Sequence, residues 1–250
     1  MDSIIQISNL KKSFNSQKVL RGVNLNIPRG QITIVIGRSG CGKSVLLKHI
    51  IGLLSPDQGH IFLDGQDLIP MNRHQLQNIR MRFGMLFQEA ALFDSMNVYD
   101  NIAFPLREHR NNNERTIREI VREKLKDVKL DGVEQKMPAE LSGGMKKRVG
   151  LARALVLNPE IILYDEPTTG LDPITAQSID DLIIETQGRI QGTSIIISHD
   201  IHATLRIANK IAMLHDGVIV AEGTASDIRQ SKNSVVQAFL YPEQKSSENS

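Results

Sequence analysis

Apolar and polar positions change their pattern several times along the chain. The first part alternates short apolar runs, at residues 4–10 and 19–27, with polar turns, and Pro28-Arg29-Gly30 closes it. This alternation predicts antiparallel strands. Residues 31–36 are a β-branched run without alternation, which is typical of a strand buried on both faces. After a Gly-rich turn, residues 44–54 have the apolar spacing of a helix.

The middle of the chain has a different character. Residues 59–63 and 83–87 are further candidate strands. Residues 116–130 place apolar side chains on one face with charges between them, which predicts an amphipathic helix. A second helix is predicted from residue 143 to 157, just before Pro159. The stretch from about 90 to 158 is therefore a helical insertion.

Short apolar runs and helical patterns alternate again after the insertion, at 161–164, 174–190, 193–197, 201–208, 211–214 and 218–221. Such alternation predicts a parallel α/β core. The expected fold is α/β, with an N-terminal antiparallel β subdomain and an inserted helical subdomain.

We expect one domain over residues 1–230, with the helical subdomain at about 90–158. Residues 231–250 are more polar and form a C-terminal extension. Two interpretations of this extension remain open. It is partly disordered, or it docks on a partner through a short helical face made of Val235, Val236, Phe239 and Leu240.

Composition excludes several classes of protein. The 250 residues are 40% hydrophobic and 23% charged, as in ordinary globular chains. The formal net charge of +2 argues against nucleic-acid binding through a strong basic field, so no nucleic-acid partner is expected. The single Cys41 forms no disulfide within the chain and points to a reducing compartment. We expect no secretory signal and no membrane span, so that any membrane role depends on a partner.

A phosphate-binding loop follows the strand at 31–36 and opens the next helix. It matches G-x-x-x-x-G-K-[ST] at every fixed position, as Gly37-Arg38-Ser39-Gly40-Cys41-Gly42-Lys43-Ser44. Glycines let successive N–H groups point at an anion, and the helix N-terminus adds partial positive charge. Lys43 is expected to reach the β- and γ-phosphates of ATP, and the Ser44 hydroxyl to bind Mg²⁺. We include the next residue, Val45, in this site.

Two carboxylates end a later apolar strand. Asp165 and Glu166 follow residues 161–164, as a metal ligand beside a phosphate loop requires. Asp165 is expected to hold Mg²⁺ through water. Glu166 is expected to act as the general base that polarises the attacking water.

A third motif, Leu141-Ser142-Gly143-Gly144-Met145, opens the helix that carries Lys146, Lys147, Arg148 and Arg153. Ser142 is a typical N-cap, and the glycines expose amides for an anion. Together with the phosphate loop and the paired carboxylates, this motif resembles the nucleotide-binding subunits of ABC transporters, over residues 1 to about 230. The resemblance implies that Ser142, Gly143 and Gly144 bind the γ-phosphate of ATP held by a second, head-to-tail copy.

The same resemblance implies roles for four further residues. Phe14 resembles the aromatic that stacks on adenine. Gln88 resembles the Gln that contacts Mg²⁺ and the lytic water. Asp172 lies in the segment that crosses the dimer interface, and His199 resembles the switch His at the γ-phosphate.

Two segments narrow the resemblance further. Residues 86–93 and 144–148, with Met145 where Gln is commoner, resemble the Mla/Mce-type lipid transport ATPases. This implies ATP-driven phospholipid transport between the inner and outer membranes of a Gram-negative bacterium. The implied partners are an integral permease, a STAS-domain subunit and an Mce-domain subunit, with the ATPase dimer peripheral on the cytoplasmic face of the inner membrane. The expected dock is the apolar insertion at residues 90–98 and 104–106, although most of these side chains are expected to fill the subdomain.

Three alternative functions are less well supported by the sequence than phospholipid transport. Another ABC transporter, such as a small-solute importer, shares the same motifs. A soluble DNA clamp usually carries a coiled coil or zinc cysteines before the Ser142 motif, and this chain has neither. A small-molecule kinase or GTPase leaves the Ser142 motif unexplained, and Asn209-Lys210-Ile211-Ala212 lacks the Asp of a guanine-binding motif.

Overall fold

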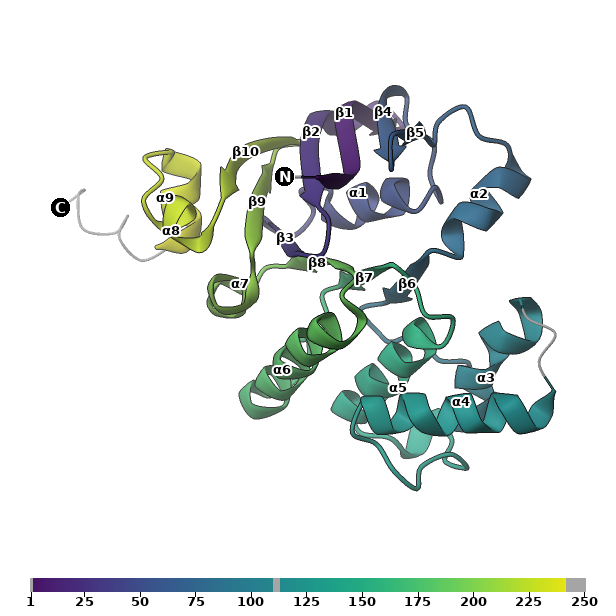
Figure 1. The fold of residues 1–250 in the computed structure, drawn as a ribbon. Coiled ribbons are helices and arrows are strands. Elements are labelled where there is room, and N and C mark those ends of the chain that lie inside the picture. Colours follow the sequence, from purple (N-terminus) through teal and green to yellow (C-terminus); the bar gives the residue numbers. More distant parts are fainter. Residues whose placement is uncertain (1, 110–112, 242–250) are drawn as a thin grey trace. The chain divides into compact units, whose positions relative to one another are not determined.

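The computed structural model describes residues 2–109 and 113–241. These residues form two compact units (Figure 1). Unit 1 contains the chain up to Arg80 and the chain from Thr193 onward, and unit 2 contains residues 81–192.

The N-terminal part of unit 1 is an antiparallel sheet in the order β2-β1-β4-β5, made of β1 (Ser3–Phe14), β2 (Gln17–Pro28), β4 (Gln58–Leu63) and β5 (Gln66–Asp67). Asn15 and Ser16 join β1 to β2, and both have left-handed φ angles, of 43° and 71°. Two left-handed residues match the twist of a hairpin. The predicted antiparallel subdomain is therefore confirmed.

Unit 1 also holds parallel strands. β3 (Ile32–Ile36) pairs in parallel with β8 (Thr193–Ser198) and with β9 (Lys210–His215). β10 (Val218–Gly223) runs antiparallel to β9, although the sequence pattern placed it in a parallel core. The reason is the connection: Asp216 and Gly217 have φ angles of 46° and 75° and close a tight hairpin.

The helices of unit 1 are α1 (Lys43–Ile50), α2 (Arg73–Arg80), α7 (Ile201–Ile207), α8 (Ala225–Arg229) and α9 (Ser234–Leu240). The first is shorter than predicted because Gly52, with φ of 68°, ends it: the Gly52 N–H returns to the His49 carbonyl at 3.0 Å. Helix α2 was not predicted, because it is almost entirely polar and buries only Ile79.

The C-terminal helix uses part of the face predicted for a partner. Val236 and Leu240 are buried, and α9 packs on α8 and β10 of the same unit. Val235 and Phe239 remain half-buried. Residues 242–250 of the predicted extension lie outside the described residues.

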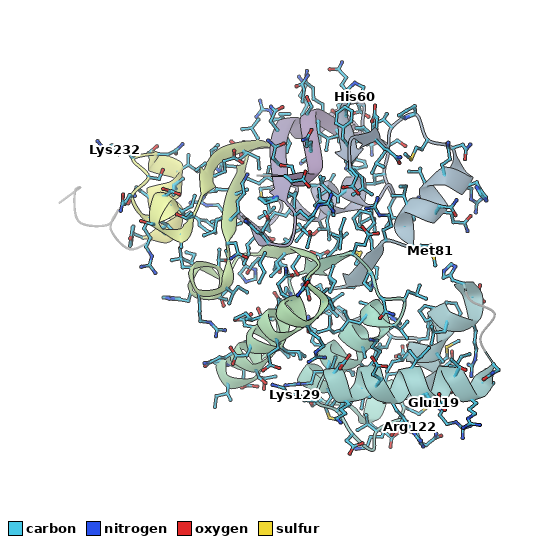
Figure 2. All side chains as sticks on the ribbon, in the orientation of Figure 1. His60, Met81, Glu119, Arg122, Lys129 and Lys232 are labelled. Carbon is cyan, nitrogen blue, oxygen red and sulfur yellow. The ribbon has the colours of Figure 1, made fainter. Side chains whose placement is uncertain are left out.

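Unit 2 combines a pair of parallel strands, β6 (Phe83–Leu86) and β7 (Ile161–Asp165), with the helices α3 (Val98–His109), α4 (Glu114–Asp127), α5 (Gly143–Leu155) and α6 (Pro173–Ile190) and the 3-10 turn η1 (Pro138–Glu140). Helices α3, α4 and α5 pack together, and α5 also packs on β6 and α6 (Figure 1). The labelled Glu119 and Arg122 lie on the exposed face of α4 (Figure 2). The predicted helical insertion is confirmed.

Helix α3 was not predicted as a helix, because Pro105 lies inside it. Proline removes a backbone donor and usually ends a helix. Here the helix continues to His109, and packing on α4 and α5 keeps Val98, Ile102 and Leu106 buried. Across the described residues, no helix combines the length and the apolar character needed to cross a bilayer.

Candidate functional site

The loop between β3 and α1 has the backbone of an anion cradle. Gly42 is the N-cap of α1 with a φ of 105°, and it has no side chain to cap the helix. The first turn of α1 carries no acidic residue. A Cβ at Gly37 would lie 2.3 Å from the Leu214 carbonyl oxygen, so this turn requires glycine. The amides at this helix start therefore remain available to an anion.

Lys43 lies across this loop. Its side chain is buried, and its Nζ donates to the carbonyl oxygens of Gly37 at 2.9 Å and Arg38 at 3.1 Å. Burial raises the pKa of the Cys41 thiol in the same loop. A protonated thiol adds no negative charge where an anion is expected.

Two other predicted residues belong to unit 1. Phe14 ends β1 with 41% of its surface exposed, and the Lys12 ammonium lies 5.5 Å from its ring centroid. His199 is exposed directly after β8. Because Ile36 of β3 pairs in parallel with Ser198, His199 and the phosphate loop leave the sheet at the same edge.

Unit 2 holds two of the three predicted catalytic residues, Gln88 and Glu166, together with the predicted metal ligand Asp165. Leu86 of β6 pairs in parallel with Tyr164 of β7, so Gln88 and the Asp165–Glu166 pair follow the same ends of two adjacent strands. Gln88 is exposed, and both carboxylates are half-buried. The Glu166 backbone is left-handed, with φ of 47°, and its carboxylate accepts a hydrogen bond from the Thr169 hydroxyl at 3.0 Å.

Two predicted interface residues are helix caps in unit 2. The Ser142 hydroxyl accepts from the Met145 N–H at the start of α5, and the adjacent Gly143 is exposed. The Asp172 carboxylate accepts from the Thr175 N–H at 3.0 Å at the start of α6. Hydrogen bonding with Thr175 lowers the pKa of Asp172, so this carboxylate stays charged.

The inward-facing cations of α5 were missed as functional candidates. The motif at residues 141–145 shows only that the helix following it carries these cations. Arg148 donates to the Val128 carbonyl at 2.6 Å and to the Ser178 hydroxyl at 2.7 Å, and Lys147 is buried. The burial of Lys147 could have been inferred from its spacing. It lies three residues from both Gly144 and Gly150, which are on the buried face of the helix.

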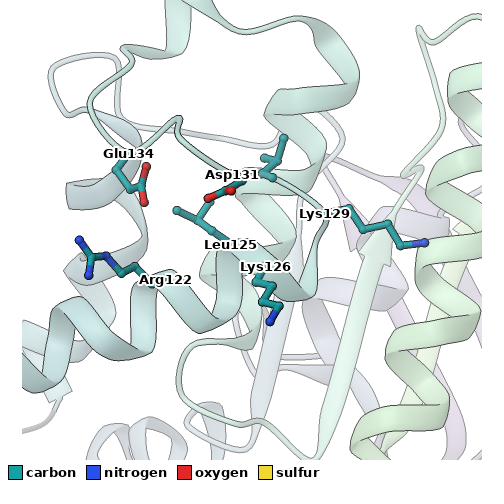
Figure 3. Close-up of a pocket in the computed structure, with 7 residues that line it drawn as sticks. Arg122, Leu125, Lys126, Lys129, Asp131 and Glu134 are labelled. Atoms are coloured by element: carbon teal, nitrogen blue, oxygen red, sulfur yellow. The ribbon is translucent and has the colours of Figure 1, made fainter.

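A separate cavity of about 620 Å³ opens beside α4, and none of the predicted residues line it. Figure 3 shows Arg122 and Lys126 extending from the helix and Asp131 and Glu134 on the loop that follows. Its wall mixes charges of both signs, so it favours no class of ligand.

Residues 20–169 match the ABC transporter family. The chain belongs to this family. It is 46% identical to the probable ribonucleotide transport ATP-binding protein mkl of Mycobacterium leprae, over 96% of this chain and 69% of that protein. It is 43% identical to the intermembrane phospholipid transport system ATP-binding protein MlaF of Haemophilus influenzae, over 96% of this chain and 91% of that protein.

A solved relative supports the same fold. The ATP-binding cassette MJ0796, in a dimeric post-hydrolysis state bound to ADP and Pi, matches with a TM-score of 0.81 and 30% identity, over 88% of this chain and 98% of that chain. The ABC family member described here is therefore an ATP-binding subunit and an ATPase with the P-loop NTPase fold. These findings confirm the predicted fold, family and activity, and they do not favour a clamp, a kinase or a GTPase.

Proposed function

We propose that this ABC ATPase hydrolyses Mg-ATP to drive phospholipid transport between two membranes. The observation that best supports nucleotide binding is the Gly37–Ser44 loop at the start of α1. The phospholipid cargo is supported by the similarity to MlaF over nearly all of that protein. The motifs at residues 86–93 and 144–148 support the same assignment.

Nucleotide binding is assigned to the residues predicted for it. The amides of residues 37–45 and the Lys43 ammonium bind the phosphates, and the exposed Phe14 ring stacks on the base. Mg²⁺, when bound, neutralises charge on the phosphate oxygens. The Ser44 hydroxyl, the Gln88 amide oxygen and the Asp165 carboxylate would hold it. These oxygen donors fit Mg²⁺, which takes few protein ligands when phosphates supply the others.

Hydrolysis is assigned to three side chains. Glu166 is the general base, and its hydrogen bond from Thr169 orients the carboxylate. Gln88 positions the attacking water, and His199 contacts the γ-phosphate.

We assign the second half of each nucleotide site to another copy of the chain. The exposed start of α5, at Ser142 and Gly143, presents amides to the terminal phosphate of ATP bound by the partner. Gly144 completes this segment, and Asp172 lies in the contact between the copies. Loss of the γ-phosphate removes the bridge between the copies and lets them separate.

A membrane permease is the proposed partner of unit 2. Of the expected dock, Ala90, Val98 and Leu106 are buried, whereas the other residues of 90–98 and 104–106 are half-buried or exposed, so fewer of these side chains fill the subdomain than expected. Phe93 is 43% exposed and its ring lies 5.1 Å from that of Phe104, and Phe87 is 38% exposed. These rings offer an apolar contact beside Gln88. The further proposed subunits contain STAS and Mce domains, and the assembly lies at the cytoplasmic face of the inner membrane.

The test uses the membrane proteins that co-purify with the chain in mild detergent, reconstituted into vesicles with labelled phospholipid or labelled ribonucleotide. We expect ATP-dependent movement of phospholipid only. The Glu166→Gln variant should bind ATP but lose hydrolysis and lipid movement by about 10²-fold or more.

Glu119→Gln, on the exposed face of α4, is the matched control and should behave as wild type. Movement of ribonucleotide instead would overturn the lipid assignment. Wild-type hydrolysis by Glu166→Gln would remove this residue from its assigned role.

A further inference from the structure

Lys147 of α5 places a buried ammonium group in contact with two loops. Lys147 is 5% exposed, and its Nζ donates to the backbone carbonyl of Gln88. The same Nζ lies 3.3 Å from the backbone carbonyl oxygen of Glu166, to which it also donates. Lys147 thus joins the backbones of the proposed water-positioning residue and the proposed general base.

Burying this ammonium costs free energy, because it loses contact with water. Burial lowers the pKa of Lys147, whereas the nearby carboxylates of Glu89, Asp165 and Glu166 oppose that shift. A buried polar group whose hydrogen bonds are satisfied makes the structure around it more rigid. The Lys147 ammonium donates to two backbone carbonyls, so the side chain fixes the position of the loops that carry them.

Both loops have strained backbone at these contacts. Ala90, Ala91 and Glu166 have left-handed φ angles of 57°, 47° and 47°. A left-handed conformation costs a non-glycine residue about 1–2 kcal/mol of conformational free energy. It persists only where the surrounding structure holds it. Lys147 contacts the Glu166 carbonyl directly and contacts the Gln88 loop two residues before Ala90.

A second cation of α5 holds only one of the loops. The Arg153 guanidinium donates to the carbonyl oxygens of Ala90 and Ala91, at 2.8 Å each, and lies 5.9 Å from the Phe93 ring centroid. Gly150, between the two cations, lets α5 approach: a Cβ there would lie 3.2 Å from the Ala90 Cβ. Arg153 therefore supports the Gln88 loop alone, whereas Lys147 supports both loops.

We propose that Lys147 is a positioning residue that locks the Gln88 loop and the Glu166 backbone into one arrangement, so that a displacement of the loop reaches the general base through α5. This inference rests on the proposed function, because it takes Gln88 and Glu166 as the groups that act on water. Lys147 itself touches neither substrate nor water in this role.

The kinetic test compares Lys147→Met with Lys126→Met, an exposed lysine of α4 that serves as the matched control. Lys147→Met should lower kcat for ATP hydrolysis by at least about tenfold, because small misplacement of catalytic groups is costly. The KM for ATP should stay within about twofold, since the nucleotide-binding groups are unaltered. Lys126→Met should leave both unchanged.

The structural test measures amide hydrogen exchange over residues 87–92 and 166–169. Lys147→Met should raise exchange in both segments, and Arg153→Met in the first segment alone. If Lys147→Met does not fold, Lys147→Gln replaces it. Its donor is one atom shorter and cannot span both carbonyls, so at least one segment should exchange faster.

Wild-type kcat in folded Lys147→Met, or unchanged exchange in both segments, would overturn the inference. The proposed function is judged separately by Glu166→Gln. Loss of hydrolysis in Glu166→Gln together with normal turnover in Lys147→Met would leave the proposed function standing and reject only the role of Lys147.

Discussion

One buried histidine next to the phosphate loop links the stability of the protein to pH. His49 lies on α1 with 1% of its surface exposed, and its Nδ1 lies 2.7 Å from the Val45 carbonyl oxygen. Burial lowers the pKa of His49, although the contact with Val45 opposes this shift. The folded protein therefore holds this imidazole neutral below the pH at which an unfolded chain protonates it.

The sign of the pH dependence follows from this difference. Above about pH 6.5, His49 is neutral in both states and contributes no pH dependence. As the pH falls below that value, the unfolded state binds the proton first, so the free energy of unfolding decreases until the lowered folded pKa is reached. We predict that His49→Leu weakens the loss of stability between about pH 7 and pH 5, measured by urea unfolding.

The exposed His74 of α2 provides the control. His74→Gln should follow the wild-type pH profile. An identical slope in wild type and His49→Leu would show that His49 is protonated equally in both states.

At this scale, the sequence singles out candidate residues where a residue type is tied to a motif. Lys43, Ser142 and Glu166 stand at fixed motif positions, and Ser142 caps its helix as predicted. Lys147 and Arg153 were not singled out, because their acceptors are backbone carbonyls. Such contacts leave no residue pattern in the partner segment and appear only once the helix is placed on the loops.

Secondary-structure elements were predictable where periodicity was strong. The amphipathic α4 was predicted at 116–130 and lies at Glu114–Asp127, bounded by the Asn113 cap. Helix α3 was missed because of Pro105, and α2 because of its polarity. For α3, tertiary packing on α4 and α5, which local patterns do not encode, decides the outcome.

Close packing of α5 and β6 gives a prediction at the scale of elements. A Cβ at Gly84 would lie 2.4 Å from the Ala154 backbone oxygen, and backbone cannot move aside as a flexible side chain can. We predict that Gly84→Ala lowers the free energy of unfolding by about 1–3 kcal/mol. Urea denaturation of the full chain measures this change.

Gly188, in α6, is the matched control for the same substitution. No heavy atom lies within 4 Å of a Cβ placed there. Gly188→Ala should instead raise the free energy of unfolding by about 0.5–1 kcal/mol, because alanine is the better helix former. Changes of the same sign in both variants would contradict the packing argument.

At the scale of the whole molecule, the proposed sharing of each site between two copies predicts complementation. Lys43→Ala and Ser142→Arg should each be inactive alone. In an equimolar mixture, half of the randomly paired dimers carry one intact site, so about a quarter of the wild-type ATPase rate should return. No recovery, with both variants folded, would place Lys43 and Ser142 in the same site of one chain.

At the scale of the whole molecule, the sequence predicted the fold class well and the direction of individual strands less well. The order of apolar runs predicted an α/β chain with an antiparallel N-terminal sheet and an inserted helical part, and the structure contains all three. The antiparallel direction of β10 was missed because it depends on the two left-handed residues Asp216 and Gly217. Turn geometry of this kind is weakly encoded in apolar patterning.

The contacts of Lys43 have a thermodynamic consequence for the family's ligand. The Gly37 and Arg38 carbonyls already hold the ammonium inside a wound loop. In the proposed role of Lys43, an incoming triphosphate replaces these carbonyls as the acceptor of the ammonium, and binding does not have to order a flexible loop. The conformational entropy of this loop is lost when the protein folds, so its ordering reduces the free energy of ligand binding only slightly.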